Sequence, residues 1–366
     1  MNKNAFLGTV LLAGTIIGAG IFSLPFIFSK IGLLAGLAYL LFFTLVYGAI
    51  HLMYARVLEK EEGEHQFFYL AHKYFPRFWA NLASLAIIGD LIFVLLVYLV
   101  LAPAFFQYVW PAPWLILMLV FWLISSIFIF VRSKVMAWAD LISILCMFGI
   151  IGLVFWAGRG QLLAADWIQP LDPTLLLLPF GPLLFSLAGR PAIHKIMELR
   201  NKTAGVFPMK SVIFWGTAIP SLVYIFFIVS VLRLQPAPSD DVFSSLSFLS
   251  PSFLLALGLM GILSLWDSYF MIGANLKDLL IFDLKYPRWL VYILVLFLPL
   301  SLYFIGFRNF LTVIGLAGGL FLSLEGIFVG AMWRRAFPGH RWRWLVWPFS
   351  LIFFLAIAYE IFAVSR

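Results

Sequence analysis

Four charged residues lie inside long apolar stretches of the sequence, where a charge is costly and therefore suggests a function. They are Asp90, Arg190, Asp267 and Glu325. At about 1.5 Å per helical residue, each lies roughly 12 to 16 Å from the same side of a bilayer. One arginine neutralises only one carboxylate, so these charges, if they face one another, leave a carboxylate that should bind a proton or another cation.

We interpret these four residues as candidates for ion coupling. Their shared depth favours a pair between Arg190 and either Asp267 or Asp90, which leaves the remaining acid to carry a coupling proton. The alternative is a static ion pair at an inner gate with Glu325 facing water, because periodicity does not show which helix face a residue occupies. Replacing each acid by its amide separates the two, since gradient-driven uptake that survives all three amides excludes the proton hypothesis.

The composition places these charges in a membrane protein. Of the 366 residues, 64% are hydrophobic and 11% are charged, whereas soluble domains carry about 25% charged residues. The apolar residues form long runs, and about 20 such residues cross a bilayer as a helix. We expect an all-α protein with about eleven transmembrane helices and no barrel. The predicted spans are residues 5–28, 31–54, 79–107, 113–131, 135–157, 174–199, 210–232, 252–276, 288–306, 309–333 and 343–364.

The net charge of +8 is distributed as in a membrane protein rather than as in a nucleic-acid-binding protein. Most of the 24 Lys and Arg residues fall in joints on one side of the predicted bilayer, which predicts a cytoplasmic N-terminus and an external C-terminus. The first run contains Gly14, Gly18 and Pro25 and is followed closely by a second span, so we expect it to be retained rather than cleaved. We predict a bacterial-type inner membrane protein. The lone Cys146 excludes a disulfide within the chain.

Two predicted spans are interrupted by Gly and Pro near their middle. The first is broken within Gly14–Pro25, and the sixth within Pro179–Pro182 and Phe185–Ile193. They lie five spans apart and so cross the bilayer in opposite directions. Broken helices at matching places in two inverted halves indicate a transporter binding site, although small residues at such places can also serve helix packing.

This pattern predicts a single transporter domain over residues 1–366. It contains two inverted repeats, residues 5–157 and 174–333, and an extra helix over residues 343–364. An unwound helix exposes N–H groups, which attract a carboxylate, and carbonyl groups, which attract an ammonium group or a cation. An amino acid carries both of these groups.

The residues of the interrupted spans also resemble those of a known family. The run Gly14–Pro25 resembles the first-helix motif of amino acid permeases in the amino acid–polyamine–organocation superfamily. It is closest to the hydroxy and aromatic amino acid permease branch and its amino acid/auxin permease relatives. The runs Phe185–Leu199 and Ser264–Leu279 are similar to the corresponding segments there. The resemblance implies a ten-helix inverted-repeat core with one extra helix, and uptake of amino acids by alternating access, driven by a proton or sodium gradient.

The resemblance also implies where ligands bind. The substrate carboxylate is expected at the first break, on Ile17, Gly18, Ala19 and Gly20. The α-amine is expected at carbonyls of both breaks, near Thr15, Phe185, Ser186 and Ala188. A sodium ion, where one is used, is expected between carbonyls near Ala13 and Ile16 and the hydroxyls of Ser264 or Ser268.

Four aromatic residues bear on which substrate side chain the protein prefers. Phe22, Phe26, Phe185 and Trp266 suggest a roomy apolar pocket for an aromatic or large neutral amino acid. Arg190 departs from the family pattern, which has a small or neutral residue in the sixth break. A carrier of another small organic solute is therefore the alternative, and an anionic solute is the first to consider.

Other functions find little support. The chain has no Walker motif, no nucleophile elbow and no His pair with metal-ligand spacing. We therefore predict no enzyme activity, no metal site and no cofactor apart from the coupling ion. A channel is disfavoured by the paired breaks. The expected partners are an amino acid and the bilayer, with no nucleic acid and no obligatory protein partner. The run Gln66–Trp79 is amphipathic and is expected on the inner surface, most simply as a solvated segment.

Overall fold

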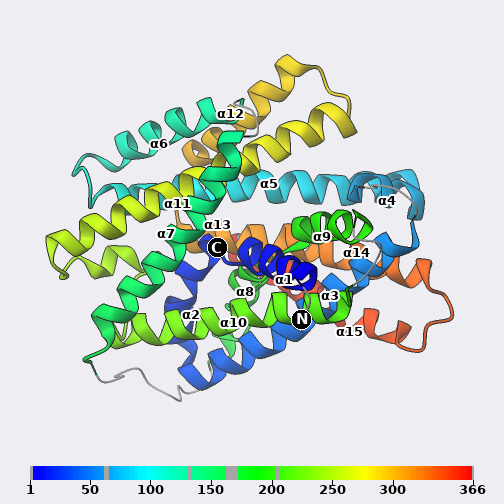
Figure 1. Cartoon of the computed structure of the whole chain (residues 1–366), viewed down its shortest axis with the longest axis horizontal. Coiled ribbons are helices and arrows are strands. Elements are labelled where there is room, and N and C mark those ends of the chain that lie inside the picture. Colours follow the sequence, from blue (N-terminus) through cyan, green and yellow to red (C-terminus); the bar gives the residue numbers. More distant parts are fainter. Residues whose placement is uncertain (1–2, 62–65, 131–133, 162–171, 203–206, 365–366) are drawn as a thin grey trace.

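The computed structural model describes residues 3–61, 66–130, 134–161, 172–202 and 207–364, and all regular structure within these ranges is helical (Figure 1). The all-α prediction is therefore confirmed. The helices are α1 (Lys3–Ile16), η1 (Ala19–Ser23), α2 (Leu24–Ile31), α3 (Leu33–Lys60), α4 (Phe67–Tyr74), α5 (Arg77–Phe106), α6 (Trp114–Phe128), α7 (Lys134–Gly158), η2 (Pro173–Leu175), α8 (Phe180–Ser186), α9 (Arg190–Lys202), α10 (Met209–Leu234), η3 (Phe243–Leu246), α11 (Pro251–Asp278), η4 (Leu279–Asp283), α12 (Arg288–Ile305), α13 (Phe310–Gly315), η5 (Leu316–Leu322), α14 (Ser323–Ala336), η6 (Arg343–Leu345) and α15 (Val346–Val364).

The helices are long and apolar enough for a membrane. Within the described ranges, eight spans meet the length and hydropathy of a bilayer crossing, or nine if the bent pair at the N-terminus forms one span. Two shorter apolar helices, Trp114–Phe128 and Ile142–Gly158, fall in the fourth and fifth predicted runs. Large hydrophobic side chains are exposed on the outside, as for Ile305 (75%) and Phe78 (70%). Such surfaces require lipid rather than water, so the protein is an integral membrane protein.

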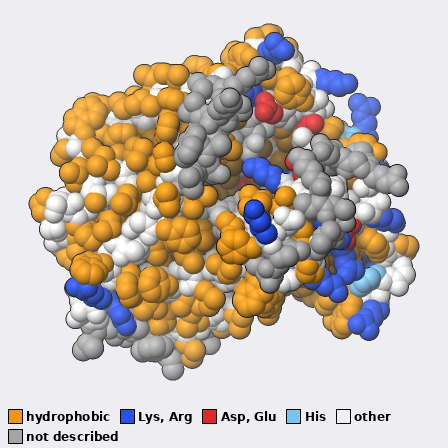
Figure 2. Space-filling model, viewed as in Figure 1, with side chains coloured by type: hydrophobic (Ala, Val, Ile, Leu, Met, Phe, Trp, Pro, Cys, Tyr) orange, Lys and Arg blue, Asp and Glu red, His pale blue; other side chains and the backbone are white. Residues whose placement is uncertain are grey.

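Charged side chains gather at one end of the bundle. In Figure 2, hydrophobic side chains cover the left part of the visible face, and most Lys, Arg, Asp and Glu side chains lie toward the right. We call this the basic end; it includes Lys60 of α3, Lys73 of α4, Arg200 of α9 and Arg335 of α14. Hydrogen bonds tie its elements together: Arg200 donates to Glu59, Lys60 to the carbonyl of Ala336, and Arg335 to the carbonyl of Tyr74.

The first span is interrupted as predicted. Helix α1 ends at Ile16, Gly18 has an extended backbone (φ −146°, ψ −161°), and η1 begins at Ala19. The two parts of the span meet at an angle of 47°. The first N–H groups of η1 and the last carbonyls of α1 therefore lack the partners that a continuous helix supplies.

The sixth span is interrupted at a narrower place than predicted. Helix α8 ends at Ser186 and α9 begins at Arg190, so residues 187–189 between them lie outside a helix. Of the predicted break at Pro179–Pro182, Pro179 lies outside a helix, at the end of a turn over residues 176–179 and as the N-cap of α8, whereas Pro182 lies in the first turn of that helix. Proline is tolerated there, since the first N–H groups of a helix have no intrahelical partner to lose.

Helix α4 packs into the basic end rather than remaining a solvated segment. Phe67, Leu70 and Ala71 are buried, and Arg190 lies over the Phe67 ring, with 5.2 Å from the guanidinium carbon to the ring centre. At the other end of α4, Glu61 accepts hydrogen bonds from Lys73 and Tyr74. This bond to Glu61 raises the pKa of Lys73.

A glycine-lined contact joins the tenth predicted span to α8 and α15. The tenth span contains the π-helix η5, between α13 and α14. Glu360 of α15 is buried, with 5% exposed. A Cβ atom added to Gly181, Gly315 or Gly319 would lie 2.5, 2.7 or 2.3 Å from an atom of the Glu360 side chain. These three glycines therefore make room for the Glu360 side chain.

Candidate substrate and ion site

A cavity of about 480 Å³ adjoins the break in the first span. Volumes of this size hold small organic ligands. The cavity extends from Gly18 to residues of the basic end, including Gln66, Glu198 and Asp278. Its wall also includes apolar side chains from three helices, namely Ile87, Leu91, Ile144, Met147, Met271 and Ile272.

The cavity collects part of the predicted site. Among the predicted substrate residues, Thr15, Ile17 and Gly18 line it. Among the predicted ion residues, it is lined by Arg190, Ser264, Asp267 and Ser268. The other predicted residues do not line it; they are Ala19, Gly20, Phe185, Ser186, Ala188, Asp90 and Glu325.

The polar wall of the cavity comes from one face of α11. Ser264, Asp267 and Ser268 are spaced three and four residues apart, which places them on the same side of a helix. Asp267 is buried with 3% exposed. The hydroxyl of Ser143 donates to the carbonyl of Ser264 over 3.2 Å, and Tyr98 of α5 lines the cavity together with Ser268. This face therefore presents a carboxylate and two hydroxyls to the cavity beside the first break.

Tyr224 joins the two broken spans. Its hydroxyl oxygen on α10 lies 2.6 Å from the carbonyl oxygen of Ile16 and 2.6 Å from that of Ser186. These carbonyls belong to the last residues of α1 and α8, where each break begins. A hydroxyl has one proton, so it donates to one carbonyl at a time. Sequence reasoning missed Tyr224, because a tyrosine within an apolar span carries no distinguishing local signal.

The two breaks are also in close contact at Gly20. A Cβ atom added to this residue would lie 2.5 Å from the Ser186 hydroxyl oxygen and 2.7 Å from the Ser186 Cα. Both atoms are too close for any real Cβ, and one belongs to the backbone. Gly20 is therefore needed for the approach of η1 to α8, and its side-chain position faces protein rather than the cavity.

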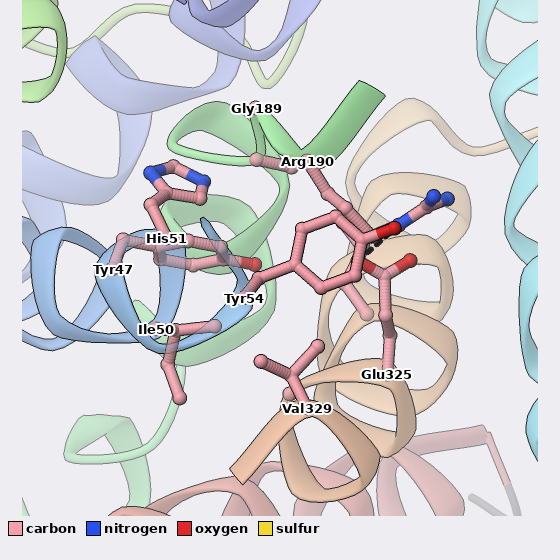
Figure 3. A pocket seen from close by; sticks show the side chains of 11 residues that line it. Tyr47, Ile50, His51, Tyr54, Gly189, Arg190, Glu325 and Val329 are labelled. Atoms are coloured by element: carbon pink, nitrogen blue, oxygen red, sulfur yellow. Dashed lines mark ion pairs between the residues drawn. The ribbon is translucent and has the colours of Figure 1, made fainter. Parts of the chain in front are cut away.

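Arg190 forms an ion pair with Glu325, with 2.7 Å between Nε and Oε1 (Figure 3). The predicted pair of Arg190 with Asp267 or Asp90 is therefore wrong. Arg190 is the first residue of α9, and Glu325 lies in the first turn of α14. The pair thus links the sixth predicted span to the tenth. The hydroxyl of Tyr54 points at the pair in Figure 3.

A second and much smaller cavity lies beside this pair. It measures about 10 Å³, close to the smallest volume that holds one water molecule. Tyr47, His51 and Tyr54 of α3 line it together with Arg190 and Glu325 (Figure 3). Its walls therefore supply polar groups from three predicted spans.

Asp90 lies near the ion pair without joining it. It is buried with 8% exposed, and it interacts electrostatically with Glu325 and Arg190. Its Oδ1 atom has no hydrogen-bond partner among the described residues. It lines neither of the two cavities, so the structure brings Asp90 close to the pair but separates it from the larger cavity.

The side of the breaks away from the basic end is closed by aromatic rings. Phe22 packs edge-on against Phe105, Phe227 and Phe243, with ring centres 5.7, 5.9 and 4.8 Å apart. All four side chains are at most 1% exposed. Phe105 lies about two helical turns beyond Tyr98, the last α5 residue that lines the cavity. We call these four rings the aromatic plug.

The aromatic residues expected to form the substrate pocket lie elsewhere. Phe22 belongs to the aromatic plug, and Trp266 packs edge-on against Phe128 with ring centres 4.6 Å apart. Neither Phe26 nor Phe185 lines the cavity. Other aromatic side chains, Phe67, Phe68 and Phe282, line the cavity instead, together with aliphatic and methionine side chains. No group of three or more His, Cys, Asp or Glu residues that could hold a metal occurs within the described ranges.

An apolar helical bundle with a cavity at an interrupted span has the architecture of a membrane transport protein. The family model described as "Transmembrane amino acid transporter protein" matches residues 1–231. The chain belongs to this family. A comparison with curated proteins found no match.

Proposed function

We propose that the protein is a secondary active transporter that imports amino acids by alternating access, driven by a proton or sodium gradient. It acts in a bacterial-type inner membrane with its N-terminus in the cytoplasm and its C-terminus outside. Eleven spans are proposed, of which ten form two inverted repeats. The family membership supports the cargo class, and the two interrupted spans support the transport mechanism.

The observation that carries this proposal is the cavity at the first break. It brings residues of the break, Thr15, Ile17 and Gly18, together with a carboxylate and two hydroxyls of α11. Gly18, the N-cap of η1, lines the cavity, and this end of the break suits the substrate carboxylate, since a helix N-terminus carries partial positive charge. Carbonyls near Thr15 and Ile17 suit its ammonium group. The N-terminal end of η1 would thus hold the negative carboxylate of an amino acid, and the carbonyls would hold its positive ammonium group.

The cavity and the aromatic plug support an inward-facing conformation. The cavity reaches the basic end, which the distribution of Lys and Arg assigns to the cytoplasm. The aromatic plug closes the other side of the breaks. Alternating access requires the reverse arrangement at another stage of the cycle, in which the plug opens and the inner end closes.

The apolar wall supports a large neutral substrate. Ile87, Leu91, Ile144 and Met147 offer aliphatic surface, and methionine adapts to ligand shape. The Arg190 guanidinium reaches the same cavity, but its charge is neutralised by Glu325. An acidic substrate would therefore have to compete with Glu325 for this charge.

Asp267 is the best-placed coupling group. It is the one carboxylate on the buried polar face of α11, and it lines the cavity beside Ser264 and Ser268. As a proton carrier, it would take up and release the proton as the cavity opens to either side. As a sodium ligand, it would act together with the two hydroxyls, because a hard cation prefers oxygen ligands.

Uptake into liposomes tests the proposal. The purified protein is reconstituted, and uptake of labelled amino acids is measured under an inward proton gradient and, separately, an inward sodium gradient. Accumulation under one gradient, competed by large neutral but not by charged amino acids, is expected. Absence of uptake by folded, monodisperse protein would show that amino acids are not the substrate. Competition by small organic anions would instead support the alternative, a carrier of another small organic solute.

Two matched variants locate the coupling group. Asp267→Asn should abolish gradient-driven accumulation while substrate exchange across the membrane continues. Asp278→Asn is the control, because Asp278 lines the same cavity but is 55% exposed and paired with Lys277. Accumulation that persists in Asp267→Asn would exclude this residue as the coupling group.

A further inference from the structure

A third cavity of about 470 Å³ lies at the basic end, apart from the substrate cavity. The two cavities share no lining residue. The third cavity is bounded by the last turns of α3, the first turn of α10, the last turn of α14 and the segment that leads into α15. Its lining residues are Ala49, Leu52, Met53, Arg56, Lys210, Trp333, His340, Arg341, Trp342 and Leu345.

The walls of this cavity suit a hydrocarbon chain. Leu52 and Met53 of α3 line it together with Trp333 of α14 and Leu345 of η6. Trp342 and two further tryptophans nearby, Trp344 and Trp347, are 45%, 57% and 62% exposed. Exposed tryptophans cluster at the level of lipid headgroups. The cavity therefore lies where a lipid of the same leaflet can enter it.

The charges of the cavity have one sign. Arg56, Lys210 and Arg341 line it, and none of the acidic residues that the structure describes does. Within the described part of the chain, none of these three has a carboxylate within ion-pair distance, whereas Lys73 and Arg200 at the same end are paired with Glu61 and Glu59. Three cations without an acidic partner among the described residues, beside an apolar space, are complementary to an anion that carries a hydrocarbon tail.

Trp333 supplies a further unsatisfied donor. Its side chain is buried with 3% exposed, and its indole N–H has no hydrogen-bond acceptor among the described residues. Its ring packs edge-on against His340, with 4.9 Å between ring centres. A buried donor without an acceptor is costly, and an oxygen-rich ligand in the cavity would remove that cost.

We propose that this cavity binds an anionic phospholipid of the leaflet at the basic end. Its phosphate lies against Arg56, Lys210 and Arg341, and an acyl chain lies along Leu52, Met53 and Leu345. Basic pockets between transmembrane helices hold anionic headgroups in this way. Because the wall comes from α3, α10, α14 and η6, the lipid joins elements of four predicted spans and stabilises the basic end as a unit.

Binding is tested on the full-length protein in detergent by native mass spectrometry and thermal unfolding, with phosphatidylglycerol against phosphatidylcholine. The wild-type protein should retain phosphatidylglycerol preferentially and unfold at a higher temperature with it. The variant Arg56→Gln/Lys210→Gln/Arg341→Gln should bind phosphatidylglycerol about 100-fold more weakly, since each cation near a membrane surface contributes roughly fivefold. Its affinity for phosphatidylcholine should not change.

A matched control separates the site from the general charge of this end. The variant Arg77→Gln/Lys285→Gln/Arg288→Gln removes three exposed cations that do not line the cavity, and it should keep the preference. Equal loss in both variants would show bulk attraction and overturn the proposal, as would an unchanged preference in the cavity variant. Leu52→Trp narrows the cavity without altering charge and should also weaken lipid binding.

A last arm identifies the source of the phosphate. Inorganic phosphate at the same concentration should not reproduce the rise in unfolding temperature, because it cannot occupy the apolar wall. If inorganic phosphate stabilises the protein as much as phosphatidylglycerol does, the site is one for a free anion and the lipid assignment is wrong. None of these measurements depends on transport activity, so the result is independent of the proposed substrate.

Discussion

Two residues, Tyr224 and Gly20, hold the two broken spans against each other. The Tyr224 hydroxyl lies 2.6 Å from carbonyl oxygens of both broken spans, and Gly20 allows the same two spans to touch. Neither residue lines the cavity. Each therefore acts by positioning the backbone groups that the substrate is proposed to meet.

Removal of the Tyr224 hydroxyl should loosen both breaks. In Tyr224→Phe, the carbonyls of Ile16 and Ser186 lose their shared donor, and a buried acceptor without a partner costs about 1–3 kcal/mol. We expect a lower unfolding temperature and a raised KM for uptake. Tyr286→Phe, at an exposed tyrosine (44%), is the control and should change neither. Unaltered stability and KM in Tyr224→Phe would show that this contact is dispensable.

A methyl group at Gly20 should be poorly tolerated. The Cβ atom of Gly20→Ala would lie 2.7 Å from the Ser186 Cα, and overpacking of this kind costs about 1–3 kcal/mol. Gly48→Ala is the matched control, because no atom lies within 4 Å of its added Cβ, and alanine is favoured over glycine in a helix by up to about 1 kcal/mol. The unfolding temperature should fall for Gly20→Ala and should not fall for Gly48→Ala. Equal stability of the two would argue against close contact of η1 with α8.

At the scale of elements, the tenth span depends on its neighbours. The π-helix η5 packs on α8 and α15 through glycines, and Glu360 fills the space that they leave. A π-helix within a span often marks a functional site. The Arg190–Glu325 pair joins the same span to the start of α9. The tenth span therefore contacts the sixth at two places, through η5 on α8 and through Glu325 on Arg190. Movement of the sixth span in a transport cycle would change both contacts.

The contact of Gly319 with Glu360 can be tested by a double-variant cycle. Gly319→Ala should destabilise the protein, because its Cβ would lie 2.3 Å from the Glu360 Cγ. Glu360→Ala removes that atom, so the double variant should be less destabilised than the sum of the two single variants. Unfolding by denaturant or heat in detergent measures all four proteins. Additive effects would mean that the two residues do not meet.

At the scale of the whole molecule, the cavity and the aromatic plug give the two sides of the bundle different access. Thr15 is exposed and lines the cavity, whereas Phe248 is 56% exposed and follows η3 beyond the plug. A proposed inward-facing state predicts labelling of these positions from opposite sides of the membrane.

Thiol labelling checks this access. In a Cys146→Ala background, a membrane-impermeant reagent should modify Thr15→Cys from the cytoplasmic side and Phe248→Cys from the outside. Substrate together with the coupling ion should change the rate at Thr15→Cys, because it shifts the population between conformations. Labelling of Thr15→Cys from the outside alone would reverse the proposed orientation or conformation.

Several features could be predicted because their causes are local. The apolar runs, the break at Gly18 and the polar face of α11 follow from side-chain hydrophobicity, from glycine and from the spacing of Ser264, Asp267 and Ser268. Glu360 also carried a usable signal, since it is an acid within the last apolar run, but it was not singled out. Tyr224 carried none, because its role depends on two carbonyls far away in the chain.

The sequence by itself determined that the chain is a helical membrane protein with an interrupted first span, because bilayer thickness and helix continuity act on contiguous residues. Only the tertiary structure decided that Arg190 pairs with Glu325, that Asp267 faces the cavity and that the expected aromatic residues do not. These outcomes depend on how each helix is rotated about its axis and packed against helices distant in sequence. The depth of a charge in the membrane is a one-dimensional property, whereas the choice of its partner needs all three dimensions.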